Sequence, residues 1–297
     1  MKIAVLGATG HLAKCAVSVY SKDDVNVFYL FSRSLNVLED MYGNRSNFFI
    51  KRYVDFPDHD YDVIFNGVGV WDTPGRNVRD VFSVTEHFDN MILDYQKKHP
   101  CSMSIHISSG AAYANDFDRP VVNGTRTTID INNFTLGDYY SVAKINSEVK
   151  HRAFEGLNIV DLRLFGFFSR YMNLGYPYLL SAMINAVKEN KRFNTVSVDF
   201  WRDYIHMDDF AGLLKGISMH GAINMAIDVR SKAPISKSQL IQFFVESYGL
   251  QVNENDAGVE ISSTGMKPCY YSKEENPIYA PSYTSLDTVK KEIKYFL

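Results

Sequence analysis

A short apolar run followed by two closely spaced glycines, at the beginning of the chain, constrains the fold most strongly. Residues 2–6 have the composition of a buried parallel strand, and Gly7, Gly10 and Ala13 follow it. The first glycine permits a tight turn, and the second lets the backbone at the start of a helix approach a pyrophosphate. Ala13 lets that helix lie close to the sheet. An ordinary glycine turn is the alternative, but the position directly after a strand favours a dinucleotide-binding loop.

Strand-like and helix-like segments alternate through the first 165 residues. Apolar runs occur at residues 2–6, 25–31, 48–54, 62–67, 103–107 and 158–164, and helical patterns occur at 10–20, 81–98 and 138–154. This alternation is typical of an α/β fold with a doubly wound parallel sheet and right-handed crossovers. Further along, the sequence predicts helices at 179–189, 210–219, 236–248 and 285–296, a late strand at 222–227 and an irregular polar stretch at 253–281.

Charge and cysteine usage exclude several classes of protein. The formal net charge of -3 gives no electrostatic reason for nucleic acid or an anionic membrane as a partner. No apolar run is long enough to span a bilayer, and the opening run is too short for a signal peptide. The three cysteines, Cys15, Cys101 and Cys269, show neither metal-ligand spacing nor a disulfide framework. We therefore expect a cytoplasmic protein with no metal.

A tyrosine and a lysine four residues apart, Tyr140 and Lys144, lie one turn from each other on the helix predicted at 138–154. An ammonium beside a phenol lowers the pKa of the phenol, so that a tyrosine can exchange a proton near neutral pH. Ser109, at the end of the fifth predicted strand, offers a hydroxyl to the reacting oxygen. A surface Tyr–Lys pair is the alternative, but the helix follows the fifth strand of a dinucleotide fold, which favours catalysis.

The end of the second predicted strand bears on the choice of cofactor. An acid at this position binds the adenosine ribose of NAD, whereas an arginine accommodates the 2′-phosphate of NADP. The chain has Ser32, Arg33 and Ser34 here, and no acid. We therefore predict NADP(H), with NAD and a solvated Arg33 as the alternative. Asp55, after the third strand, is predicted either to contact the adenine or to cap a helix.

Four motifs in order resemble the extended short-chain dehydrogenase/reductase family, in its NAD(P)-dependent nucleotide-sugar epimerase/dehydratase/reductase group. They are the segments 7–13, 108–113, 140–144 and 202–211. The resemblance implies a Rossmann-like, NADP-binding domain formed by residues 1–165 and about 196–228. It implies a smaller C-terminal α/β substrate lobe formed by 166–195 and 229–285, and a C-terminal helix at 286–297.

The resemblance also assigns roles to residues. Tyr140 is the acid/base, Lys144 binds the nicotinamide ribose and lowers the pKa of Tyr140, and Ser109 holds the substrate oxygen. Arg202 matches an arginine that contacts the substrate diphosphate; the alternative is that Arg202 pairs with Asp203 while His206 and Asp208 brace the loop. The implied cofactor-binding residues are Gly7, Thr9, Gly10, His11, Leu12, Arg33, Asp55, Asn66, Gly67, Val68, Tyr140 and Lys144.

Three departures from the family pattern restrict which reaction and which substrate contacts the chain is expected to have. Dehydratases of the group have an Asp–Glu pair directly after the serine, where this chain has Gly110 and Ala111, so 4,6-dehydration is not expected. The usual Arg-Pro-x-Asn after the sixth strand is replaced by the segment 163–166, Arg-Leu-Phe-Gly, which predicts a changed substrate contact. No arginine follows Arg230, although a second diphosphate arginine is common in that region.

These features predict the NADPH-dependent reduction of a 4-keto, nucleotide-linked, 6-deoxy sugar, and the resemblance implies a role in polysaccharide biosynthesis. Tyr140 would protonate the new alkoxide and Ser109 would polarise the carbonyl. An NAD-dependent 4-epimerase needs the same residues and is the first alternative. A 3,5-epimerase/reductase needs a further acid/base pair, and His106 and Cys101 lie too far back along the fifth predicted strand to provide it. A non-catalytic dinucleotide sensor usually lacks the tyrosine or the lysine, and this chain has both. The family also implies a homodimer formed by helices at about 80–98 and 139–154.

Overall fold

The computed structural model describes residues 1–70, 77, 79–114, 117–254 and 267–297. They form two compact units, each assembled from separate stretches of the chain. The first unit contains Met1–Ala114, Thr128–Leu164 and Ala211–Asp228, and the second contains Asn115–Thr127, Phe165–Phe210 and Val229–Leu297. Residues 196–210 and 115–127 thus group with the second unit, although the sequence-based division places them in the Rossmann domain. Among the described residues, no helix is both long and apolar enough to span a membrane.

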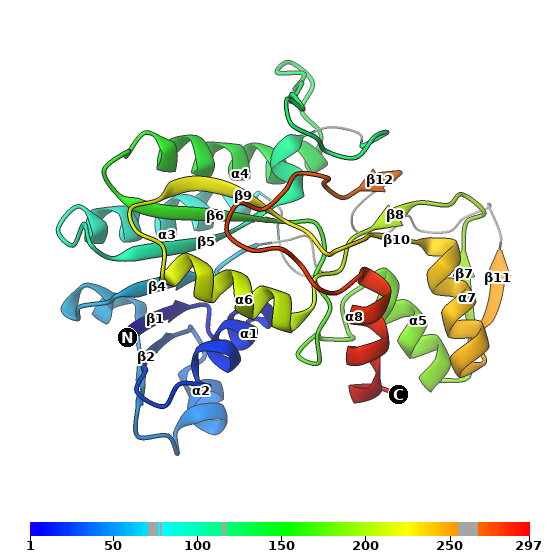
Figure 1. Ribbon diagram of the computed structural model, residues 1–297, viewed down its shortest axis with the longest axis horizontal. Helices are drawn as coiled ribbons and strands as arrows, with labels where there is room; N and C mark the ends of the chain where they lie inside the picture. Colours follow the sequence, from blue (N-terminus) through cyan, green and yellow to red (C-terminus); the bar gives the residue numbers. More distant parts are fainter. Residues whose placement is uncertain (71–76, 78, 115–116, 255–266) are drawn as a thin grey trace. The chain divides into compact units, whose positions relative to one another are not determined.

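The first unit is built on a seven-stranded sheet with the order β3-β2-β1-β4-β5-β6-β9 (Figure 1). Its strands are β1 Lys2–Leu6, β2 Val27–Phe31, β3 Phe48–Lys51, β4 Val63–Asn66, β5 Met103–Ser109, β6 Asn158–Leu164 and β9 Asn224–Val229. The pairs from β3 to β6 are parallel, so their carboxyl ends share one edge. The predicted α/β class and parallel doubly wound sheet are confirmed.

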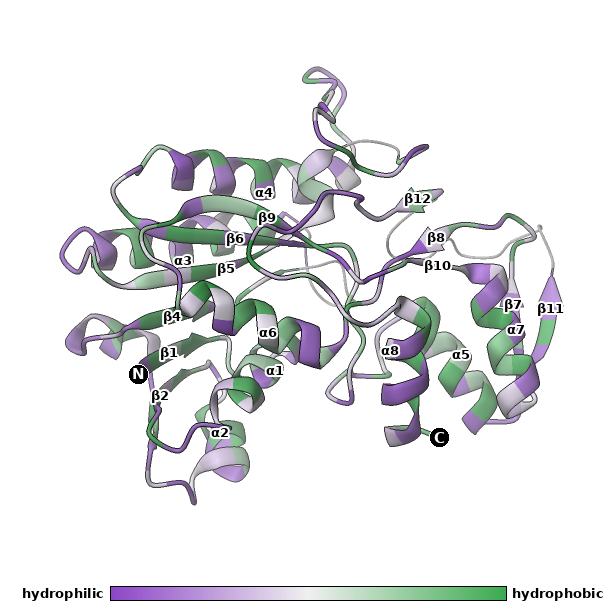
Figure 2. Ribbon diagram, in the orientation of Figure 1, coloured by the Kyte–Doolittle hydropathy of each residue, from purple (hydrophilic) through white to green (hydrophobic). Residues whose placement is uncertain are grey.

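Helices connect the strands on both faces of this sheet. They are α1 His11–Tyr20, α2 Leu35–Tyr42, α3 Asp80–Gln96, α4 Leu136–Arg152 and α6 Met207–Ser218, with the 3-10 helices η1 Tyr53–Asp58 and η2 Gly110–Tyr113. α3 and α4 pack together, and the Tyr20 hydroxyl of α1 is bonded to Ser218 of α6, 2.7 Å away (Figure 1). The apolar strands explain this packing: residues 3–6 of β1 are completely buried, and β1 is largely green in Figure 2.

The order of the strands indicates at which edge of the sheet a ligand is expected to bind. From β1 the strand order runs outward through β2 to β3 on one side and through β4 to β9 on the other, so the topological switch point lies between β1 and β4. In open parallel sheets, ligands bind at such a switch point, outside the carboxyl ends of the strands. Gly7 and Gly67 follow directly on those two strands. The register also aligns polar residues on adjacent strands, because Asn66 pairs with His106 and His106 pairs with Asp161.

The second unit has its own core. Its helices are α5 Leu179–Lys188, α7 Lys237–Tyr248 and α8 Ser285–Glu292, followed by the 3-10 helix η3 Ile293–Tyr295. Two small sheets accompany them: β10-β8-β12 (Ile235–Ser236, Trp201–Arg202, Cys269–Tyr270) and β11-β7 (Gln251–Glu254, Arg192–Thr195). The core residues include Phe168, Leu180, Met183, Leu240, Phe244 and Val289. The sequence predicted these helices but not the short strands.

Candidate active site

The glycine loop between β1 and α1 brings two backbone segments into close contact. Gly7 has a φ of 70°, in the left-handed region that favours glycine. A Cβ added to Gly7 would lie 3.1 Å from the carbonyl carbon of Gly67, and one added to Gly67 would lie 3.2 Å from the Cβ of Ala13. The N–H of Gly10 donates to the Gly7 carbonyl at 2.7 Å. Only small residues allow this approach of loop, turn and helix.

We expect Gly7→Ala to destabilise the protein by about 1–3 kcal/mol and to weaken dinucleotide binding at least about tenfold. A methyl group strains the left-handed backbone and pushes Gly67 away from the loop. Urea unfolding and a fluorescence titration with NADPH measure the two effects. Gly156→Ala is the matched control, because nothing lies within 4 Å of its added Cβ. Unchanged NADPH affinity in Gly7→Ala would contradict the assignment of the loop.

The N-terminus of α1 is suited to an anion. Gly10 is the N-cap residue and provides no side-chain cap, and the dipole and N–H groups at the start of a helix attract anions. His11 begins the helix; burial and the nearby charge of Lys14 lower the pKa of His11 to about 4, so its imidazole is neutral at pH 7. Thr9 lies beside the end of β2, since its hydroxyl is 3.3 Å from that of Ser32.

The end of β2 lies next to the glycine loop. The N–H of Ala8 donates to the carbonyl of Phe31 at 3.0 Å, and Arg33 follows two residues later with an exposed side chain. Asp55 accepts from the N–H of Arg52 at 3.1 Å, within η1, which is the capping role considered for it. Sequence reasoning missed Tyr53, whose hydroxyl accepts from the N–H of Gly7 at 3.2 Å. No periodic or spacing signal connects Tyr53 to the loop.

The turn after β4 contributes Asn66, Gly67 and Val68. The Asn66 side chain is buried; its oxygen accepts from the N–H of Val68 at 3.2 Å, so its amide nitrogen faces His106 at 3.3 Å. Because Asn66 is bonded on both sides, the turn has a fixed shape next to the glycine loop. Gly67 and Val68 follow β4, which is paired with β1 at the switch point, and their contact with a cofactor stays a prediction.

The helix α4 brings Tyr140 and Lys144 together. The ammonium of Lys144 lies 5.6 Å from the centre of the Tyr140 ring and donates to the carbonyl of Ile107 at 2.8 Å. Lys144 is only 6% exposed, whereas Tyr140 is half-buried. Since Ile107 precedes Ser109 by two residues on β5, the lysine fixes α4 to the same strand that ends in the serine. The Ser109 oxygen accepts from the N–H of Ala111 at 3.1 Å.

A buried ion-pair network lies behind Ser109. The adjacent Ser108 donates to Glu148 at 2.6 Å, and Glu148 binds Arg163 through two nitrogens. Arg163 also donates to the hydroxyl of Tyr113 at 2.9 Å, and Tyr113 donates to Asp228. Burial and the Asp228 carboxylate raise the pKa of Tyr113. Glu148 and Asp228 were missed because they come from α4 and β9, far from Ser109 in sequence.

Arg202 lies in the second unit, on β8. It donates to the carbonyls of Trp201 at 2.8 Å and Lys267 at 2.7 Å, and its guanidinium is 4.2 Å from the centre of the Phe200 ring. Burial lowers the pKa of Arg202. Asp203 accepts instead from Ser231 and Ser285. The Nδ1 of His206 accepts from the N–H of Asp208 at 3.1 Å, which is the bracing considered for these two residues.

Comparisons with known proteins agree with this fold. A UDP-glucuronic acid 4-epimerase from Bacillus cereus superposes with a TM-score of 0.81 at 17% identity, over 100% of this chain and 99% of that chain. A UDP-N-acetylglucosamine 4-epimerase from Methanobrevibacter ruminantium gives 0.79 at 15% identity, over 99% and 97%. A dTDP-glucose 4,6-dehydratase from Bacillus anthracis gives 0.77 at 14% identity, over 100% and 96%. A search of curated proteins found no match.

A family model provides the stronger evidence, because it rests on the sequence itself. The model for the NAD dependent epimerase/dehydratase family matches residues 3–222, which contain the glycine loop, Ser109, Tyr140 and Lys144. The resemblance noted in the sequence is thereby confirmed, and with it a nicotinamide dinucleotide as the type of cofactor. The chain belongs to the NAD-dependent epimerase/dehydratase family.

Proposed function

We propose that the protein is an NADPH-dependent reductase of a 4-keto, nucleotide-linked, 6-deoxy sugar. The observation that carries this proposal is the catalytic set itself: Tyr140 and Lys144 lie together on α4, Lys144 is bonded to β5 near Ser109, and Gly110 and Ala111 follow the serine. This set can protonate an oxygen but adds no further acid or base. Arg202 is proposed to contact the substrate diphosphate.

The chain around the glycine loop fits a dinucleotide. Gly7, Gly10 and Gly67 let the loop, helix and turn approach one another closely, because an added Cβ would lie only 3.1–3.2 Å from neighbouring atoms of the protein. The N-terminus of α1, which has no side-chain cap, suits a pyrophosphate. We propose that this loop, the turn 66–68 and Lys144 hold the cofactor, with Asp55 and Arg33 at its adenosine end. When bound, the nicotinamide supplies the hydride.

The protein side of the reaction follows from the positions of three groups. Tyr140 gives the proton of its hydroxyl to the substrate oxygen as that oxygen gains negative charge. The ammonium of Lys144 stabilises the tyrosinate that remains, and the hydroxyl of Ser109 donates a hydrogen bond to the same substrate oxygen. The carboxylates of Glu148 and Asp228 are bound by Arg163 and Tyr113, so they serve the scaffold rather than proton transfer.

The second candidate is an NAD-dependent 4-epimerase. It uses the same tyrosine, lysine and serine, and two of the structures of similar fold are 4-epimerases. Mass spectrometry of the nucleotide released from denatured, freshly purified protein separates the candidates. Released NADP, or a site that takes up NADPH in preference to NADH, supports the reductase and should be followed by reduction of 4-keto nucleotide sugars. Stoichiometric NAD would favour the epimerase.

Arg33 provides a direct test of the cofactor. Arg33 follows Ser32, which contacts Thr9 of the glycine loop, so its guanidinium can reach a 2′-phosphate near the end of β2. We expect Arg33→Ala to lower the affinity for NADPH about tenfold or more and to leave that for NADH unchanged. Arg45→Ala is the control, because Arg45 is exposed and packs on Phe48. Equal losses for both dinucleotides in Arg33→Ala would contradict the NADP assignment.

The proposed enzyme acts in polysaccharide biosynthesis in the cytoplasm and forms a homodimer through α3 and α4. The pathway and the dimer rest on the family resemblance, and the cytoplasmic location rests on the cysteine usage. Sedimentation of the purified protein measures the oligomeric state directly.

A further inference from the structure

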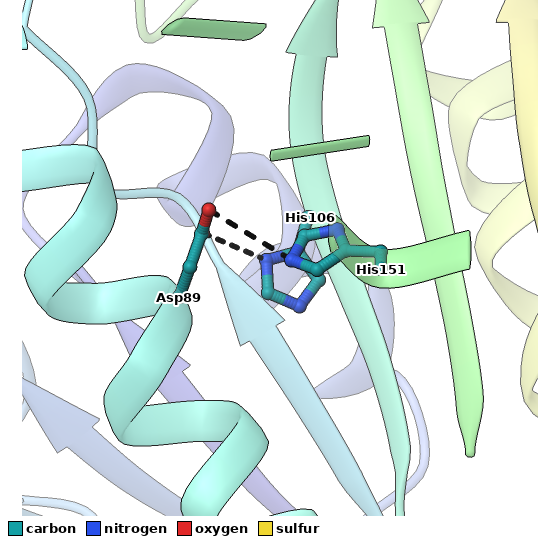
Figure 3. A group of neighbouring side chains, drawn as sticks. All are labelled: Asp89, His106 and His151. Atoms are coloured by element: carbon teal, nitrogen blue, oxygen red, sulfur yellow. Dashed lines mark ion pairs between the residues drawn. The ribbon is translucent and has the colours of Figure 1, made fainter. Parts of the chain in front are cut away.

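A cluster of buried ionisable side chains lies next to the catalytic lysine and takes no part in the proposed reaction. Asp89 of α3, His106 of β5 and His151 of α4 are 3%, 3% and 0% exposed. Figure 3 shows their side chains pointing toward one another from three different elements. They line one small cavity of about 10 Å³ together with Asn66 and Lys144. The hydrogen bonds around them determine which of their atoms carry lone pairs.

The bonds of Gln96 fix the tautomer of His106. The amide nitrogen of Gln96 donates to the carbonyls of Ser102 and Asn158, both at 2.9 Å, so its oxygen accepts from the Ser104 hydroxyl at 2.9 Å. Having donated its proton, the Ser104 oxygen accepts from the Nε2–H of His106 at 3.1 Å. The Nδ1 of His106 therefore carries a lone pair, and the amide nitrogen of Asn66 donates to it at 3.3 Å, a bond that an ion at this nitrogen would replace.

A carboxylate fixes the tautomer of His151. The Nδ1–H of His151 donates to Asp161, with distances of 2.9 and 3.1 Å to the two oxygens. Asp161 also accepts from Arg152 at 2.9 Å, as expected for an ionised carboxylate. The Nε2 of His151 consequently carries a lone pair, and it has no hydrogen-bond partner among the described residues. An unpartnered nitrogen in a fully buried ring is costly unless something binds it.

Both lone pairs face the carboxylate of Asp89. One Asp89 oxygen lies 3.6 Å from the Nδ1 of His106, and the other lies 3.8 Å from the Nε2 of His151. These distances are too long for hydrogen bonds. The Ser147 hydroxyl donates to Asp89 at 2.5 Å, which holds the carboxylate in place. Lys150 lies 3.7 Å from Asp89 but donates to Glu86 and Asn90. The two imidazole nitrogens and the two oxygens of Asp89 are thus gathered beside the same small cavity.

We propose that Asp89, His106 and His151 bind a divalent transition-metal ion, of which Zn²⁺ is the best match. The three ligand atoms lie within 4.8 Å of one another. The two imidazole nitrogens lie 3.6 and 3.8 Å from different oxygens of Asp89, so the carboxylate would turn to offer one oxygen at the edge of about 3.4 Å that bonds of about 2.0–2.1 Å impose on a tetrahedral site. Two imidazoles and a carboxylate are ligands that zinc accepts.

The surroundings of the cluster support a metal site. Each ligand is oriented by a partner of its own: Ser147 for Asp89, Ser104 for His106 and Asp161 for His151. A carboxylate on the second nitrogen of a histidine is the usual support for a metal-binding imidazole. The ion would connect α3, β5 and α4 directly beneath Lys144, and so would stiffen the scaffold that holds the catalytic lysine.

The test uses the full-length protein, freed of metal with EDTA and then titrated with Zn²⁺ against a chromogenic chelator. We expect one Zn²⁺ per chain, and a loss of affinity of about 100-fold or more in both Asp89→Asn and His151→Gln. His87→Gln is the matched control, since His87 is an exposed histidine on the same helix, and its affinity should equal that of the wild type. Circular dichroism of the metal-free proteins checks that each variant is folded.

A second measurement needs no variant. Co²⁺ in place of Zn²⁺ should give the visible absorption bands of a tetrahedral site with two imidazole ligands, and Zn²⁺ should raise the Tm of the wild-type protein. Stoichiometric zinc that binds Asp89→Asn and His151→Gln as tightly as the wild type would overturn the proposal, as would a wild-type protein that binds no zinc. Neither measurement depends on catalytic activity, so the proposed reductase function can fail without affecting this result.

Discussion

Tyr140→Phe should lower kcat for reduction of the keto sugar by about 10²–10⁴-fold while leaving the affinity for NADPH nearly unchanged. The substitution removes only the hydroxyl that gives up the proton. The ring remains half-buried, where it packs with Val81 and Ala143, so the fold should be preserved. Single-turnover kinetics with bound NADPH measure the chemical step directly, and a fluorescence titration measures cofactor binding.

Tyr139→Phe is the matched control for this experiment. Tyr139 is the neighbouring tyrosine on α4 and packs against Phe82, with ring centres 5.9 Å apart. No lysine follows it at a spacing of four residues, and its variant should retain wild-type kcat. If Tyr140→Phe also kept full activity, Tyr140 would not be the proton donor. If the wild type itself bound a dinucleotide without turnover, the protein would be a dinucleotide sensor.

The sequence predicted the parts of the fold that have a strong local pattern. The strands of the central sheet are apolar runs between turn residues, and the long helix α3 has helical periodicity, so their positions were predicted to within a few residues. α2 was not predicted, because it has eight residues and only Leu38 is buried. The two-residue strands of the second unit are too short to show any period.

The residues of the candidate site also differ in how far the sequence could predict them. The spacing of Gly7 and Gly10 and that of Tyr140 and Lys144 are fixed by a turn and by one helix, so their meeting could be predicted from the sequence. Asp89, His106 and His151 come from three elements and meet only through the packing of α3 and α4 on β5. The spacing of the three cysteines therefore gave no sign of them. The expectation of no metal rested on that spacing, and the cluster is the reason to test it.

Lys144→Met should lower kcat/KM by about 10²–10³-fold and weaken NADPH binding about tenfold. Methionine keeps the unbranched stem of lysine but removes the ammonium, which donates to the Ile107 carbonyl and lies beside the Tyr140 ring. Both the stabilisation of the tyrosinate and the hydrogen bond proposed to the nicotinamide ribose are lost. Steady-state kinetics and an NADPH titration measure the two effects separately.

The stability of the variant tells a catalytic loss from misfolding. Lys144 is 6% exposed and donates to the Ile107 carbonyl, so Lys144→Met relieves the desolvation of the ammonium but leaves that carbonyl without a donor; because the two effects oppose each other, the Tm should stay within about 4 °C of that of the wild type. Lys97→Met, at an exposed lysine that pairs with Asp94 at the end of α3, should change neither activity nor Tm. A Tm lowered by more than about 4 °C, with proportionate loss of activity, in Lys144→Met would mean that the lysine mainly supports the packing of α4 on β5. Reduced activity at full stability would place its ammonium at the reacting centre.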